Sequence, residues 1–249
     1  MRRAELPAVL VLFALFLGLA TSAGAHTFTT QEFKCPIDGK RFTAMVDGSG
    51  YQEGVRLDLK PVGPTPAPWI IPVCPKCHFV VYDEELDPEV KKRLRPFIFS
   101  KEYKRLAKEH SSSSYFLLAK IFEFQGEDDE AIGDMYLQAS WEVEYKKPER
   151  YHPYLRAARD AYSRSLGSVS RERENGVAVQ FLIGELDRQL GEFERAEALF
   201  ASLAATLESP DGETWRQLIA LERKLIAAKD SAPYQRPVFV EQGSQQEAE

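Results

Sequence analysis

The sequence predicts a mainly α-helical protein of the α+β class, in which a small β-rich module precedes a series of α-helical hairpins. Three observations lead to this prediction. The chain has 249 residues, of which 44% are hydrophobic, so it is long enough to bury a substantial core. All three cysteines lie within residues 26–86, among many glycines and prolines. From residue 87 onward, apolar residues recur at helical spacing.

The first element is a predicted signal peptide over residues 1–25. Arg2 and Arg3 provide a cationic start, residues 6–20 are almost entirely apolar, and Ala23-Gly24-Ala25 is a small-x-small cleavage pattern. The apolar run is shorter than the roughly 20 residues that span a bilayer, and no second run of that length follows. We therefore expect a bacterial protein that is cleaved after Ala25, is periplasmic or secreted, and has no membrane span after cleavage.

Residues 26–86 are expected to form the small β-rich module. Prolines within residues 61–72 lack the amide donor that a helix needs, and Gly48-Ser49-Gly50 is unfavourable for a helix. Val46, the alternating stretch 55–59 and the run 77–82 favour short strands. A module of about 60 residues buries little core, so it usually needs a covalent or metal staple.

A helical domain is predicted over residues 87–230. Asp87 is a favourable N-cap, and Pro88 suits the first position of the helix that follows. Ser100 is expected to cap a second short helix, and Ser114, at the end of a polar break, a third.

Two segments of this domain, residues 115–139 and 180–204, resemble each other. Aligned without gaps, Gly126 matches Gly191, and each glycine separates two apolar helices. The offset of 65 residues is about two units of a 34-residue repeat. The pattern resembles tetratricopeptide-type helical hairpins, which stack so that neighbouring pairs share one core.

Two further helices complete the predicted domain. Residues 154–166 and residues 211–228 both carry apolar side chains at helical spacing. The tail over residues 231–249 is rich in Pro, Gln, Ser and Glu, so we expect it to be disordered. Trp69 and Trp141 are expected to be packing residues.

The cysteines form two short motifs typical of metal sites. The first reads Cys35-Pro-Ile-Asp38-Gly and the second reads Cys74-Pro-Lys-Cys77-His78. Each resembles half of a zinc ribbon, in which a tight turn presents two ligands and two such turns complete a tetrahedron. Cys35, Asp38, Cys74 and Cys77 are therefore the predicted zinc ligands, with His78 as an alternative fourth ligand.

These motifs, together with the run 181–191 (FLIGELDRQLG) and its continuation GEFERAEALF, resemble the bacterial family called domain of unknown function 2225. The resemblance covers about residues 33–230. It implies a zinc-ribbon-like module followed by tetratricopeptide-like helices, and it implies no activity. The sequence departs from the family pattern at Asp38 and His78, and in its predicted export.

Two other chemistries are compatible with the second motif. Cys74-Pro-Lys-Cys77-His78 matches the C-x-x-C-H pattern of c-type haem attachment, with His78 as the iron ligand of an electron-transfer protein. Alternatively, in an oxidising compartment, Cys74 and Cys77 would form a disulfide or exchange thiols as a redox protein.

Net charge and the absence of catalytic motifs exclude further classes of function. The formal charge of −6 argues against a nucleic-acid-binding protein, and the sequence contains no complete catalytic motif. We therefore expect an exported, non-enzymatic scaffold whose helical repeat groove binds a protein or peptide partner, with the zinc-ribbon-like module in a structural role.

Overall fold

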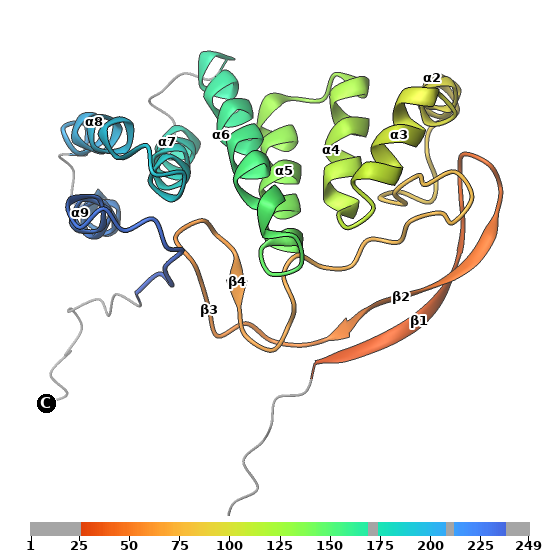
Figure 1. Ribbon diagram of the computed structural model, residues 1–249, viewed down its shortest axis with the longest axis horizontal. Helices are drawn as coiled ribbons and strands as arrows, with labels where there is room; N and C mark the ends of the chain where they lie inside the picture. Colours follow the sequence, from red (N-terminus) through yellow and green to blue (C-terminus); the bar gives the residue numbers. More distant parts are fainter. Residues whose placement is uncertain (1–25, 169–173, 208–211, 238–249) are drawn as a thin grey trace, which may run out of the picture.

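The computed structural model describes residues 26–168, 174–207 and 212–237. The predicted signal peptide and the tail beyond residue 237 lie outside these residues. The described chain is mainly helical with two small sheets, which confirms the predicted α+β class. Figure 1 shows the helices side by side, with the strands running along one end of the array. Among the described residues, no helix combines the length and the apolar character needed to cross a bilayer.

The strands belong to two antiparallel pairs. β1 (Thr27–Lys34) pairs with β2 (Arg41–Ser49), and β3 (Gly54–Val55) pairs with β4 (Pro61–Val62). The strand expected around Val46 is therefore present. β1 is almost entirely exposed, so no apolar alternation marks it in the sequence. The strand expected over residues 77–82 is wrong, because this run contributes only a single bridge between Val80 and Val73.

The helices begin and end at local signals in the sequence. Asp87 accepts hydrogen bonds from the amides of Glu89 and Val90, and Ser100 accepts one from Tyr103. The helices are α2 (Pro88–Ile98), α3 (Lys101–Glu109), α4 (Ser114–Gln125), α5 (Asp129–Val143), the short 3-10 helix η1 (Pro148–Arg150), α6 (Tyr151–Ser168), α7 (Glu174–Gln189), α8 (Phe193–Ala204) and α9 (Glu213–Ala227).

One predicted cap is wrong. Ser113 caps α4, with its hydroxyl 3.0 Å from the amide nitrogen of Phe116, whereas Ser114 is the first residue of the helix. Any serine of this polar run can cap a helix, so the sequence did not fix the exact position.

Two helical hairpins form where the similar segments predicted them. Gly126 follows α4 with φ 73°, Gly191 follows α7 with φ 78°, and this left-handed conformation is one that glycine adopts without strain. Inside the second hairpin, a β-carbon on Gly184 would lie 2.6 Å from the ring of Phe200. The absence of a side chain at Gly184 therefore allows α7 and α8 to pack closely.

The loop after β3 reaches far from its own module. Leu57 is 1% exposed and packs in the core shared by α7, α8 and α9, against residues such as Phe181 and Leu218. Next to it, Arg56 pairs with Asp58 and with Glu144, whose carboxylate is 2.7 Å from the guanidinium. Residues 56–58 therefore connect the N-terminal module both to the core of α7, α8 and α9 and to Glu144 at the end of α5.

The start of the C-terminal tail is ordered, contrary to the prediction of disorder from residue 231. The Tyr234 carbonyl accepts a hydrogen bond from the Leu57 amide, and the Arg236 amide donates one to the Val55 carbonyl, both at 2.8 Å. This part of the tail acts as an extra strand-like segment beside β3 (Figure 1). Its partner is about 180 residues away in sequence, so composition alone gave no sign of the pairing.

One large core joins the two predicted parts. It includes Cys35, Cys74 and Phe79 from the N-terminal module, and it continues without a break through the helices as far as Leu186. The module therefore does not depend on a core of its own, because it packs directly on α2, α3 and α4.

Candidate functional site

The two cysteine motifs fold into two turns with the same hydrogen bonds. In the first turn, the Cys35 amide donates to the Lys40 carbonyl and the Gly39 amide donates to the Cys35 carbonyl, both at 2.9 Å. In the second, the Cys74 amide donates to the Phe79 carbonyl and the His78 amide to the Cys74 carbonyl, again at 2.9 Å. Each turn therefore presents its first and fourth side chains toward the same side.

The residue after the fourth position has a left-handed backbone in both turns. Gly39 has φ 75° and His78 has φ 61°. Glycine adopts this conformation freely, but a residue with a β-carbon is strained there. His78 thus occupies a position for which the geometry favours glycine.

The turns bring the four predicted ligands together. One side-chain atom from each of Cys35, Asp38, Cys74 and Cys77 lies within 4.8 Å of the other three. The sulfurs of Cys35 and Cys77 are 3.6 Å apart, and the Cys74 sulfur is 3.7 Å from an oxygen of Asp38. The edges of a tetrahedron of sulfurs around zinc are about 3.8 Å long. The four residues therefore form a group that could hold a metal ion, and their spacing is compatible with zinc.

The cysteines of this group are shielded from water. Cys35 and Cys74 are completely buried and Cys77 is 3% exposed, whereas Asp38 is partly exposed. All three cysteines are free, so no disulfide competes for their sulfurs. A buried set of thiols with one carboxylate at the surface is a suitable environment for a closed, structural metal site.

The thiols influence one another's protonation. The hydrogen bond with Cys77 lowers the pKa of Cys35 to about 7, and the same contact, together with burial, raises the pKa of Cys77. Burial also raises the pKa of Cys74. Burial acts to raise the pKa of Asp38, but hydrogen bonds from the Lys40 amide and the neighbouring thiols outweigh it and lower that pKa. A metal ion would displace the remaining thiol protons, since thiolate is the binding form.

Helices α2 and α3 hold both turns in place. The Arg95 guanidinium donates a hydrogen bond to the Ile37 carbonyl in the first turn. The Tyr103 hydroxyl donates one to the His78 carbonyl in the second, at 2.8 Å. Both donors come from the helical array, so the relative position of the two turns is set by the helices as well as by the ligands.

His78 does not belong to the four-residue group. It is exposed, and it lines a separate cavity beside α3. The alternatives that use Cys74 and Cys77 for haem attachment or thiol exchange stay predictions.

A groove lies where the proline-rich loop packs on α5. It has a volume of about 900 Å³, and apolar, aromatic and charged side chains from this loop, β1, α4, α5 and the tail line it. Three of its aromatic residues are half exposed or more, with exposed fractions of 51% for Phe28, 53% for Trp69 and 83% for Tyr145. The expectation that Trp69 is a packing residue is therefore wrong, whereas its neighbour in the groove, Trp141, is partly buried against the core. No local sequence pattern marks this groove, because a loop and a helix distant from it in the sequence form it together.

The walls of the groove are fixed by hydrogen bonds. The Tyr115 hydroxyl donates to the Trp69 carbonyl at 3.0 Å, and the Ile70 amide donates to the Asp47 carboxylate at 2.6 Å. These contacts anchor the loop to α4 and β2 on both sides of the exposed indole. The backbone that carries the Trp69 indole is therefore held in position by the protein itself.

Comparisons with known proteins place the chain in a family. No curated protein and no solved structure matches it. The model of a bacterial family matches residues 28–227, a range that includes both cysteine turns, all the helices named above and the lining of the groove except for its residues from the tail. This match covers most of the chain and agrees with the resemblance seen in the cysteine motifs. The chain therefore belongs to the family described as uncharacterized protein conserved in bacteria (DUF2225).

Proposed function

We propose that the protein is an exported, non-enzymatic scaffold that binds an extended segment of a protein partner in the groove beside Trp69. The observation that carries this proposal is the presence of exposed aromatic side chains around one groove, on a loop whose backbone is hydrogen-bonded to α4 and β2. Monomeric proteins seldom expose several large aromatic residues around one cavity unless they bind something there. Tyrosine and tryptophan are also the residues that contribute most to binding at protein interfaces.

The lining of the groove favours an extended peptide. Pro61, Pro66 and Pro68 form one side, and Trp141 and Tyr145 of α5 and its C-terminal end form the other. Aromatic grooves of this kind accept extended chains, because an extended chain can place alternate side chains between rings. Lys146 is among the lining residues, and its ammonium group favours a partner that carries an acidic residue.

In this proposal the metal site has a structural role. Zinc bound by Cys35, Asp38, Cys74 and Cys77 would join the turn between β1 and β2 to the turn that follows the proline-rich loop. Most of the groove residues that come from the N-terminal module belong to β1 or to the proline-rich loop, and each of these segments leads into one of the two turns. Zinc would thereby hold the module against the tetratricopeptide-like hairpins. The proposal that the protein is exported is based on the predicted signal peptide.

Metal analysis and an absorption spectrum of the protein purified from a periplasm test the metal's part in this function. We expect about one zinc ion per chain and no visible colour. A haem band would instead support the c-type haem protein. A metal-free protein whose thiols titrate reversibly between free and bridged forms would support the redox protein.

Selection of short random peptides against the full exported chain tests the groove. The substitutions Trp69→Ala and Tyr145→Ala should each lower the affinity for the selected peptides by about 30-fold, which is the loss typical of a central aromatic contact. Phe124→Ala is the matched control, because Phe124 is 42% exposed on α4 and does not line the groove. Peptides that bind Trp69→Ala as tightly as the unmodified chain would contradict the proposal.

A further inference from the structure

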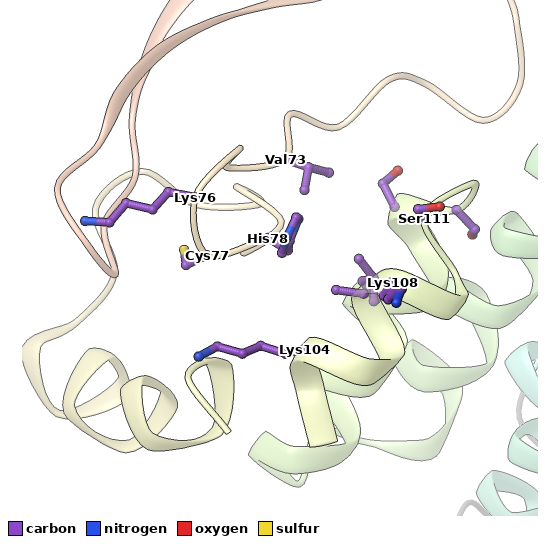
Figure 2. Close-up of a pocket in the computed structure, with 11 residues that line it drawn as sticks. Val73, Lys76, Cys77, His78, Lys104, Lys108 and Ser111 are labelled. Atoms are coloured by element: carbon purple, nitrogen blue, oxygen red, sulfur yellow. The ribbon is translucent and has the colours of Figure 1, made fainter. Parts of the chain in front are cut away.

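A second cavity lies beside the metal-site turn that contains Cys77. It has a volume of about 590 Å³ and opens between this turn, α3 and the start of α4. Figure 2 shows His78 near its centre, with Lys104 and Lys108 on the helix that forms the opposite wall. Lys76 belongs to the turn itself. The volume is in the range of sites that bind small molecules.

The cavity is cationic although the chain as a whole carries a formal charge of −6. Lys76, Lys104 and Lys108 line it, and no aspartate or glutamate is among its lining residues. Within the described residues, the lysines that form ion pairs are Lys60, Lys92 and Lys120, all outside this cavity. None of the three cavity lysines is in an ion pair with a carboxylate of the described residues, although Lys76 acts on the nearby Asp38, whose pKa it helps to lower, and the Lys104 ammonium lies 6.0 Å from the centre of the Phe99 ring.

The arrangement of these charges is unfavourable without a ligand. Lys104 and Lys108 are four residues apart on α3, so they lie on the same face and repel each other. An anion bound beside either of these two ammonium groups would offset this repulsion.

His78 supports a role for the cavity in binding. Its left-handed backbone is strained, whereas the equivalent position in the first turn is Gly39. The strain is maintained by the Tyr103 hydroxyl, which holds the His78 carbonyl at 2.8 Å. An imidazole is thus placed in the cavity where a glycine would fit the backbone better.

The start of α4 does not supply the binding groups. Its amides are already satisfied, since the Glu142 carboxylate accepts hydrogen bonds from the amides of Ser114 and Tyr115, and Ser113 accepts one from Phe116. An anion in this cavity would therefore contact side chains, which leaves the lysines, His78 and the Ser111 hydroxyl as its partners.

We propose that this cavity binds a small molecule that carries a phosphate group. Several separate ammonium groups suit a phosphate, whose oxygens accept hydrogen bonds from many directions, whereas a planar carboxylate favours the paired donors of arginine. Val73 and Leu117 provide an apolar wall for the remainder of the molecule. This inference is independent of the partner groove, which lies beyond Ser114 and has different lining residues apart from that serine.

Calorimetric titration of the full, metal-loaded chain with phenyl phosphate tests the proposal, with phenylacetate as the carboxylate of similar shape. We expect saturable binding of phenyl phosphate that weakens with added salt, and much weaker binding of phenylacetate. Lys104→Gln and Lys108→Gln should each lower the affinity for phenyl phosphate by about tenfold. Lys224→Gln, which removes the same charge from an exposed position on α9, should leave the affinity unchanged.

Three results would overturn the proposal. One is the absence of saturable phenyl phosphate binding, and another is equal affinity for phenylacetate. The third is loss of bound metal from Lys104→Gln and Lys108→Gln, because the lysines would then serve to offset the negative thiolates of the metal site. His78→Gly provides an independent check. It relieves the backbone strain, so the metal content should stay constant, and it removes the imidazole, so the affinity for phenyl phosphate should fall.

Discussion

Arg188 of α7 and Glu222 of α9 are both completely buried, and the guanidinium Nε lies 2.7 Å from the carboxylate Oε2. Glu185, also completely buried, pairs with the same guanidinium at 2.7 Å. Arg188 further donates to the carbonyls of Asp230 and Ala232, so it connects two helices and the tail. Two buried carboxylates therefore share one cation.

This excess of buried acid predicts a pH-dependent stability. Burial raises the pKa of both Glu185 and Glu222 in the folded protein. A raised folded pKa means that the pair contributes its full stability below the ordinary glutamate value of 4.5 and loses it as the pH rises through the folded pKa. Glu222→Gln mimics the protonated carboxyl, so its unfolding temperature should change less between about pH 5 and about pH 8 than that of the unmodified chain. Thermal unfolding followed by circular dichroism measures this, and an unchanged pH dependence would show that the pair is not the source.

Gly39 and His78 occupy equivalent positions in the two cysteine turns, and we expect substitutions there to have opposite effects on stability. A β-carbon on Gly39 would contact nothing within 4 Å, so Gly39→Ala tests backbone strain alone and should lower the free energy of unfolding by about 1–2 kcal/mol. His78→Gly should keep it or raise it, by up to about 1 kcal/mol, because the strain is relieved. Urea unfolding of the metal-loaded proteins gives both values. A destabilised His78→Gly would mean that the imidazole makes stabilising contacts which outweigh the strain.

Asp38 is the candidate ligand at which the sequence departs from an all-cysteine group. Asp38→Cys should bind zinc at least as tightly as the unmodified chain, because a fourth thiolate completes the set. Asp38→Ala removes a ligand. Loss of an outer-shell partner alone weakens metal binding by about 10- to 100-fold, so this variant should lose at least that much. Competition with a coloured chelator measures both, and unchanged affinity in Asp38→Ala would exclude Asp38 as a ligand.

The burial of Leu57 among the last three helices predicts that this side chain contributes to the stability of the whole protein. Leu57→Ala leaves a cavity in the core of α7, α8 and α9 and should lower the free energy of unfolding by about 2–5 kcal/mol. Leu59→Ala is the matched control, because Leu59 is 50% exposed two residues later and should change stability by less than about 0.5 kcal/mol. Equal effects of the two substitutions in urea unfolding would contradict the packing of Leu57.

Features with local causes were predictable from the sequence. Asp87 and Ser100 cap helices because each accepts hydrogen bonds from amides two or three residues later, and Gly126 and Gly191 end helices because glycine tolerates a positive φ. The grouping of Cys35, Asp38, Cys74 and Cys77 in space was predictable as well, since each pair has the spacing of one tight turn.

Features that depend on distant segments were not predictable in this way. Leu57 is buried by helices more than 100 residues away, and Tyr234 is fixed by a backbone partner in the same loop. The exposure of Trp69 likewise depends on how the proline-rich loop lies against α4 and α5. No local pattern encodes these contacts, because they are decided by which surfaces remain available after the helices have packed.

The backbone pairing of Val55 with Arg236 has a practical consequence for dissecting this molecule. A fragment that starts at the first helix would lack Leu57, Arg56 and the strand on which the last described residues rest. A fragment that stops after α9 would leave Arg188 without two of its carbonyl acceptors. We therefore expect that the helices do not form a stable domain when they are separated from the rest of the chain. We also expect insertions and deletions among relatives to be absent from the regions where the N-terminal module contacts the tail.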